Sequence, residues 1–187
     1  MIIDNIEIDI IDIDLTRPYT IAYKTTSSIK TLVVKIILSD GTVGLGASNI
    51  SKYVVGLDTI DSYNSSKEYV DYLKGQNIDS FWMIINDIEN KFINDPGSKA
   101  AFNLAVYDAY CKNLGISIGK FLGRKIKCLP TSITVGIKNT EETISEINEY
   151  QGMGFSYIKI KLGNNVDEDI RRINIINEKF SNKIKIR

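Results

Sequence analysis

The pattern of apolar and polar positions in the first part of the chain predicts β-structure. Residues 5–15 alternate between the two classes and change phase at Ile10–Ile11, as a strand with a bulge or bend does. Residues 29–48 contain two β-rich runs on either side of Asp40-Gly41, which is a strong signal for a β-hairpin. The polar residues 16–28 between these runs are predicted to form a long loop.

Helical periodicity follows, in three segments that cover residues 59–75, 79–93 and 98–115. The first is amphipathic and has a C-cap glycine at Gly75, and the second begins at Asp79 as an N-cap. The third carries small and apolar residues nearly all round the helix, so we expect it to be the most buried of the three.

A different pattern begins near residue 127. Strand-like runs at 131–137, 156–162 and 183–187 alternate with helical runs at 140–154 and 166–180. Short connections between alternating strands and helices are typical of parallel β-α-β units.

The sequence therefore predicts two domains. Residues 1–126 form an α+β capping domain with a β-hairpin or meander and a helical bundle, and residues 127–187 form the first β/α units of a TIM-type (β/α) barrel. A closed barrel of this type needs about 250 residues. We therefore expect an incomplete barrel with two complete β/α units and part of a third strand.

Composition and charge exclude several classes of protein. The 187 residues contain 23 Lys plus Arg and 23 Asp plus Glu, so no net field favours nucleic acid or an acidic membrane. No apolar run is long enough to span a bilayer, and residues 1–10 carry acids and lack the basic start of a signal peptide, so a cytoplasmic protein is expected. Cys111 and Cys128 fit no metal or disulfide spacing and are expected to be reduced.

Candidate chemistry is limited because the chain has no histidine, which leaves Lys, Asp, Glu or Tyr for proton transfer. Lys159 and Lys161 share one face of the strand "FSYIKIKLG". In a barrel, Ile158, Ile160 and Leu162 would face the helices, and the lysines would lie at the C-terminal end of the strand, where active sites of this fold lie.

Two interpretations of this lysine pair remain open. The pair either belongs to a solvated strand face or forms a cationic site. In a cationic site, one amine acts as a base once it is deprotonated, and the other ammonium stabilises the enolate-like anion left by removal of a proton next to a carboxylate.

Four segments together resemble the enolase superfamily, in its mandelate racemase/muconate lactonizing enzyme branch, and most of all dipeptide epimerases of the L-Ala-D/L-Glu type. These segments are residues 15–36, 41–59, 101–123 and 154–163. They are similar to the first capping loop and its strand, the G-x-G-A hairpin return with the second capping loop, a helix and turn, and the K-x-K strand.

The resemblance implies a role for individual residues. Lys161 corresponds to the catalytic acid/base, and Lys159 to the partner that neutralises the substrate carboxylate and the enolate. Lys24 would meet an acidic group of the substrate, Tyr19 and the 50–57 stretch would close over it, and Thr134 would offer it a hydroxyl. A solvated loop charge, loop packing and an ordinary strand threonine are the alternatives for Lys24, Tyr19 and Thr134. Asp108 is interpreted as a structural hydrogen-bonding residue and Cys111 as a core residue.

The resemblance also implies Mg²⁺, held by acidic ligands on later barrel strands. Those ligands, and the opposing base, would lie beyond Arg187, so we expect no metal ligand and no activity in this chain alone. Whether the chain is an enzyme stays open between a dipeptide epimerase, a muconate or chloromuconate cycloisomerase, and a truncated non-catalytic remnant.

The expected partners are a small-molecule substrate, either a dipeptide or another carboxylate, and further copies of the chain. Self-association is expected because a partial barrel exposes a strand edge and an apolar interior. Neither nucleic acid nor a membrane is expected as a partner.

Overall fold

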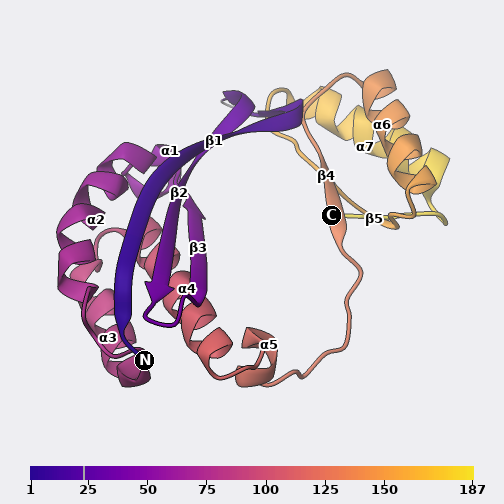
Figure 1. Ribbon diagram of the computed structural model, residues 1–187. Helices are drawn as coiled ribbons and strands as arrows, with labels where there is room; N and C mark the ends of the chain where they lie inside the picture. The colour runs from indigo at the N-terminus through magenta and orange to yellow at the C-terminus, as the bar shows by residue number, and fades with distance from the viewer. Residues whose placement is uncertain (23) are drawn as a thin grey trace. The chain divides into compact units, whose positions relative to one another are not determined.

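The computed structural model describes residues 1–22 and 24–187 and divides them into two compact units (Figure 1). The first unit comprises Met1–Ile13 and Ile29–Lys125, and the second comprises Asp14–Ser28 and Ile126–Arg187. Each unit has its own helices and its own apolar core. The two long N-terminal strands contribute residues to both units.

The N-terminal sheet has the order β1-β2-β3. Its strands are β1 (Ile3–Ile21), β2 (Lys24–Leu38) and β3 (Val43–Asn49). β2 and β3 pair antiparallel from Thr31 opposite Asn49 to Ile37 opposite Val43. The turn between them has Gly41 at φ +84°, and the Thr42 amide donates to Asp40 Oδ1 over 2.9 Å. The hairpin predicted around Asp40-Gly41 is confirmed.

The long loop predicted for residues 16–28 is wrong. β1 continues to Ile21 and β2 already begins at Lys24, while residue 23 lies outside the described residues. The segment is polar, but it is rich in threonine and tyrosine, which fit a pleated strand. A side-chain hydrogen bond of 2.9 Å between Thr20 and Thr25 joins the two strands near their turn.

Helices form one side of the first unit in Figure 1. They are α1 (Lys52–Val55), α2 (Thr59–Leu73), the 3-10 turn η1 (Ile78–Ser80), α3 (Phe81–Lys91), α4 (Pro96–Asn113) and α5 (Ile118–Phe121). A capping box between Asp58 and Asp61 starts α2, and Gly75 follows its end at φ +86°. The N-cap predicted at Asp79 is wrong, because Asn77 caps η1 by accepting from the Asp79 amide.

α4 is the buried helix of this unit, as the sequence predicts. It approaches β3 so closely that a Cβ on Gly46 would lie 1.9 Å from the carbonyl oxygen of Ala101. Cys111 is buried in the core. Asp108 accepts a hydrogen bond of 2.8 Å from the Leu45 amide, which confirms its structural role.

The second unit contains a parallel sheet of order β4-β5-β6. Its elements are β4 (Ser132–Val135), α6 (Thr140–Gly152), β5 (Tyr157–Ile160), α7 (Val166–Phe180) and β6 (Lys185–Ile186). Figure 1 shows α6 and α7 on the same side of this sheet. The predicted succession of β/α units is therefore present, after an α+β part.

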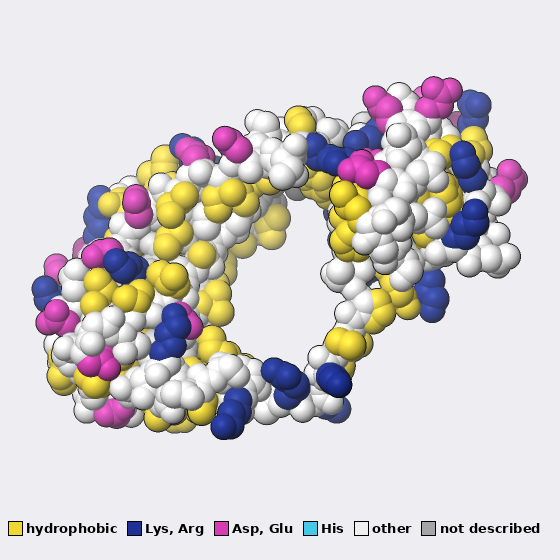
Figure 2. Space-filling model, turned by 45° about the vertical axis from the view of Figure 1, so that its right-hand side comes forward, with side chains coloured by type: hydrophobic (Ala, Val, Ile, Leu, Met, Phe, Trp, Pro, Cys, Tyr) yellow, Lys and Arg dark blue, Asp and Glu magenta, His cyan; other side chains and the backbone are white. Residues whose placement is uncertain are grey.

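The surface of the first unit carries charges of both signs. On the face shown in Figure 2, its acidic and basic side chains are interspersed, except toward the middle of the lower margin of the view, where only basic ones lie. Within residues 1–22 and 24–187, none of the helices combines the length and the apolar character that crossing a bilayer requires.

Candidate functional site

The two faces of the parallel sheet differ in chemistry. Ile158 and Ile160 are buried in the core shared with α6 and α7, whereas Tyr157 and Lys159 are half-buried on the other face. This confirms the predicted parity within β5. The prediction for Leu162 is wrong: it is 45% exposed, because β5 ends at Ile160 and the chain then leaves the sheet.

Lys159 lies in a row of side chains that crosses the sheet. Thr134 of β4 is its register partner on one side. On the other side the Arg187 amide donates to the Ile158 carbonyl, and the Ile160 amide donates to the Arg187 carbonyl, both over 2.9 Å. This pattern puts Arg187 opposite Lys159. Register partners point to the same face, so a hydroxyl and two cations lie side by side there.

Lys161 is the first residue after β5 and is half-buried. Its amide donates to the Val135 carbonyl over 3.0 Å, so its backbone remains attached to the end of β4. Lys161 therefore stands at the C-terminal edge of the parallel sheet, two residues after Lys159 in the direction of the strand.

The turn region of the β1–β2 hairpin contacts this same edge. The Ile137 amide donates to the Thr20 carbonyl over 3.0 Å, directly after β4. A Cβ on Gly136 would lie 3.6 Å from Tyr19 Cδ2, and one on Gly163 would lie 3.3 Å from the Ala22 Cβ. Residues 19–22, called here the cap segment, thus contact the residues that follow β4 and those that follow β5.

Lys24 is the one sequence-predicted site residue without a contact to this group. It is exposed at the start of β2, and its side chain forms no hydrogen bond or ion pair with the other described residues. The structure therefore brings Lys159, Thr134 and Tyr19 to the edge that carries Lys161, and leaves Lys24 in solvent.

A network of ion pairs lies beside the cap segment and was missed by the sequence analysis. Arg17 donates to both carboxylate oxygens of Glu149, over 2.7 and 3.1 Å, and lies 3.5 Å from Glu146 Oε1. The Lys138 ammonium lies 2.6 Å from Glu146 Oε2. Through these contacts α6 holds both β1 and the segment that follows β4.

These contacts shift the pKa of Glu149 and that of the neighbouring Tyr150. The hydrogen bond from Arg17 lowers the pKa of Glu149. Burial, followed by a hydrogen bond of 2.6 Å to Glu146, raises the pKa of Tyr150 to about 12. Tyr150 donates this hydrogen bond through its phenolic hydroxyl.

A metal centre is not formed by the described residues. Residues 1–22 and 24–187 contain no group of three or more Asp, Glu or Cys side chains placed to hold an ion, and the sequence has no histidine. The residues present thus do not fit the Mg²⁺ site that the resemblance implies.

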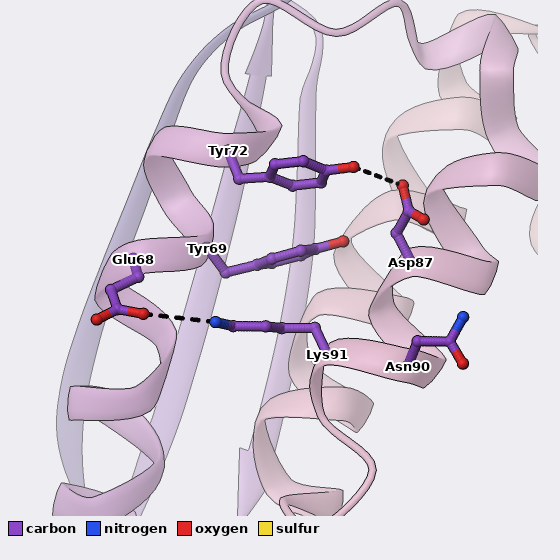
Figure 3. Close-up of a pocket in the computed structure, with 6 residues that line it drawn as sticks. All are labelled: Glu68, Tyr69, Tyr72, Asp87, Asn90 and Lys91. Carbon is purple, nitrogen blue, oxygen red and sulfur yellow. Dashed lines mark hydrogen bonds and ion pairs between the residues drawn. The ribbon is translucent and has the colours of Figure 1, made fainter.

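A separate pocket of about 390 Å³ lies within the first unit, between α2 and α3 (Figure 3). It is lined by Glu68, Tyr69, Tyr72, Asp87, Asn90 and Lys91. Tyr72 donates to Asp87 over 2.9 Å, and Lys91 pairs with Glu68 over 3.4 Å. Because its charged side chains are paired with neighbours in the pocket, we assign the candidate chemistry to the lysine-bearing edge instead.

Comparison with known proteins identifies the family of the chain. Residues 5–123 match the family described as mandelate racemase / muconate lactonizing enzyme, N-terminal domain. An L-Lys-D/L-Arg epimerase from Desulforapulum autotrophicum is 39% identical over 178 residues, which are 94% of this chain and 50% of that protein. An L-Ala-D/L-Glu epimerase from Bacillus subtilis is 30% identical over 190 residues, which are 100% of this chain and 52% of that protein.

Solved structures show the same relation. The dipeptide epimerase from Methylococcus capsulatus, complexed with Mg and the dipeptide L-Arg-D-Lys, has a TM-score of 0.95 at 30% identity. The match covers 100% of this chain and 53% of that one. The chain spans about half the length of the curated relatives it matches.

Proposed function

Because the chain belongs to the mandelate racemase / muconate lactonizing enzyme family, we propose that it supplies the substrate-covering domain and the first catalytic base of a dipeptide epimerase. The observation that carries this proposal is the position of Lys161. It stands at the C-terminal edge of a parallel sheet, where the cap segment contacts Gly136 and Ile137, which follow β4, and Gly163, which follows β5. Active sites of β/α barrels lie at this edge.

In the proposed reaction the neutral amine of Lys161 removes the α-proton next to the substrate carboxylate. The C–H bond breaks, the proton moves to Lys161 Nζ, and the electron pair delocalises into the carboxylate to give an enolate-like anion. The Lys159 ammonium stabilises that negative charge, and the Thr134 hydroxyl beside it donates a hydrogen bond to the substrate. Return of a proton to the opposite face of the carbon inverts the centre.

Mg²⁺ and the base for the opposite face belong to the proposal for the complete protein. The metal would stabilise negative charge on the substrate carboxylate as a Lewis acid. Since the described residues offer no set of ligands for it, we propose that groups outside these 187 residues hold it. The Methylococcus capsulatus dipeptide epimerase, which was solved with Mg, supports a role for the metal.

Lys24 does not select the preferred dipeptide, because its exposed side chain makes no contact with the edge that carries Lys161. We propose as substrate either a dipeptide with an acidic residue, such as L-Ala-L-Glu, or one with a basic residue, such as L-Lys-L-Arg. Names of both substrate types occur among the relatives, so the two dipeptides form a direct comparison.

The test begins with the gene, which is sequenced past the Arg187 codon. The product of the complete gene, whatever its length, is incubated in D₂O with Mg²⁺ and each dipeptide, and α-deuterium incorporation is followed by NMR. We expect exchange that EDTA abolishes and that Lys161→Met lowers by about 10³-fold or more. The 187-residue chain alone is expected to show no exchange.

Lys183→Met is the matched control, because Lys183 is an exposed lysine of the other alternating basic segment. Equal rates in Lys161→Met and Lys183→Met would refute the assignment of the base. If the protein converts cis,cis-muconate and exchanges the α-proton of neither dipeptide, the proposed function changes from an epimerase to a cycloisomerase.

A further inference from the structure

The buried stripe of α7 begins with two charged residues. Its buried positions are Asp169, Arg172, Ile176 and Phe180. Arg172 is only 5% exposed, while its neighbour Arg171 is exposed. A buried guanidinium is costly unless its donors are paired, so the partners of Arg172 indicate what it does.

These partners lie at the ends of β4 and β5. Arg172 Nη1 donates to the carbonyl oxygen of Lys138, and Nη2 donates to that of Lys161 over 3.1 Å. Nη2 also donates to Asp169 Oδ1 over 2.6 Å. The other carboxylate oxygen of Asp169 accepts from the Gly163 amide over 2.7 Å.

The backbone around Lys161 is therefore fixed at three points. Its amide is bonded to Val135, its carbonyl to Arg172, and the amide two residues later to Asp169. Gly163 has φ +130°, a conformation that favours glycine and turns the chain away from the sheet. Together these bonds fix the backbone from which the Lys161 side chain extends, at a place where the strand ladder has ended.

The planar fork of an arginine suits this arrangement. One guanidinium reaches two carbonyl oxygens that follow different strands and still contacts a carboxylate. Lysine keeps the charge but lacks the fixed pair of donors. Buried ion pairs of this kind add little net stability, which favours a role in defining geometry.

We propose that Arg172, oriented by Asp169, is a positioning residue that fixes Lys161 for proton transfer. The inference rests on the proposed function, because it assigns Lys161 as the base. Proton transfer is sensitive to displacement of the base, and a misplacement of about 1 Å can cost about 100-fold in rate.

The experiment compares Arg172→Lys with Arg171→Lys in the product of the complete gene. We expect Arg172→Lys to lower kcat for α-deuterium exchange by about 10- to 100-fold with KM changed by less than about 3-fold. Arg171→Lys should leave both values unchanged. Asp169→Asn keeps an acceptor for Gly163 and loses the charge, so its kcat should lie between those of the other two variants.

Amide hydrogen exchange in the same proteins gives a readout independent of activity. In Arg172→Lys, protection should fall about 10-fold or more at Lys161 and Gly163 and stay unchanged at Ile158 and Ile160. Equal kcat in the two arginine variants, or loss of protection throughout β4 and β5, would overturn the positioning role.

Failure of the proposed function has a different signature. If the wild-type protein exchanges no α-proton of either dipeptide, the proposed function fails, whatever the variants do. The fixing of Lys161 by Arg172 is then decided by amide exchange alone: a loss confined to residues 161–163 supports it, and no change refutes it.

Discussion

The two units bury different kinds of polar side chain. In the first unit the buried polar groups among the described residues are hydroxyls and one carboxylate: Thr31, Thr59, Ser62, Ser66, Ser98 and Asp95. In the second unit they are one hydroxyl, Thr143, and three charged groups, Glu146, Asp169 and Arg172. The smaller unit thus buries more charged side chains than the larger one.

The partners of these groups explain the difference. Asp95 accepts hydrogen bonds of 2.6 to 2.7 Å from Ser62, Ser65 and Ser98, which join α2 to the start of α4. Burial alone would raise the pKa of Asp95, but these bonds and that of the Ser98 amide hold it below 3.8. The charges of the second unit instead bind backbone carbonyls and β1. Buried polar groups join helices in one unit and fix the candidate site in the other.

Phe102→Ala should give the largest effect, in the first unit. Phe102 is fully buried and its ring stacks on Phe92 with centroids 5.4 Å apart, so truncation should cost about 4 kcal/mol in the free energy of unfolding. Trp82 is the single tryptophan of the chain and lies on α3, so its fluorescence during urea denaturation reports this unit. The control Leu104→Ala, on an exposed face of α4, should cost about 0.5 kcal/mol or less; equal shifts would contradict the described core.

Glu146→Gln should have an intermediate effect, confined to the second unit. The change keeps an acceptor for Tyr150 and removes the charge that pairs with Lys138 and Arg17. We expect about 1 to 2 kcal/mol of local destabilisation, seen as faster amide exchange within residues 132–187 and an unchanged Trp82 transition. The exposed Glu142→Gln is the control. A shifted Trp82 transition would show that the units do not respond separately.

The pair of Arg17 and Glu149 should give the smallest effect, and one that depends on pH. The pKa of Glu149 is lowered in the folded chain, so its contribution is fully present above its reference value of 4.5 and is lost as pH falls through the lower folded value. The thermal midpoints of wild type and Glu149→Gln should therefore differ at pH 7 and converge at acidic pH, and high salt should also reduce the difference. If the difference between the two thermal midpoints grew on acidification, the Glu149 carboxylate would not stabilise the fold through its pair with Arg17.

The sequence predicts the regular elements well, because their patterns are local. The helix expected at 166–180 is present with those bounds, and the inward and outward residues of β5 follow strand parity. Leu162 departs from the pattern because a glycine at φ +130° follows and the strand has ended. The polarity of residues 16–28 predicts a loop, but the strand propensity of their threonines outweighs it.

The candidate site was predictable only in part. A K-x-K pattern marks the lysines themselves, but their supporting residues lie on helices far along the chain. Arg172 carried one unused signal: with Asp169, Ile176 and Phe180 it follows helical spacing, which puts two charges on an otherwise buried stripe. Nothing comparable marks Arg17, whose partners Glu146 and Glu149 are more than 120 positions away.

The division of the chain between its two units has a consequence for recombination. The polypeptide passes from one unit to the other three times, after residues 13, 28 and 125. A gene exchange with a crossover near residue 125 would therefore combine β4, β5 and β6 from one ancestor with the cap segment from the other. Arg17 and Glu149, which form an ion pair, would then come from different ancestors. Modular shuffling of such a protein has to carry residues 14–28 as an insert, so the cap segment and the lysine strand are expected to be inherited together.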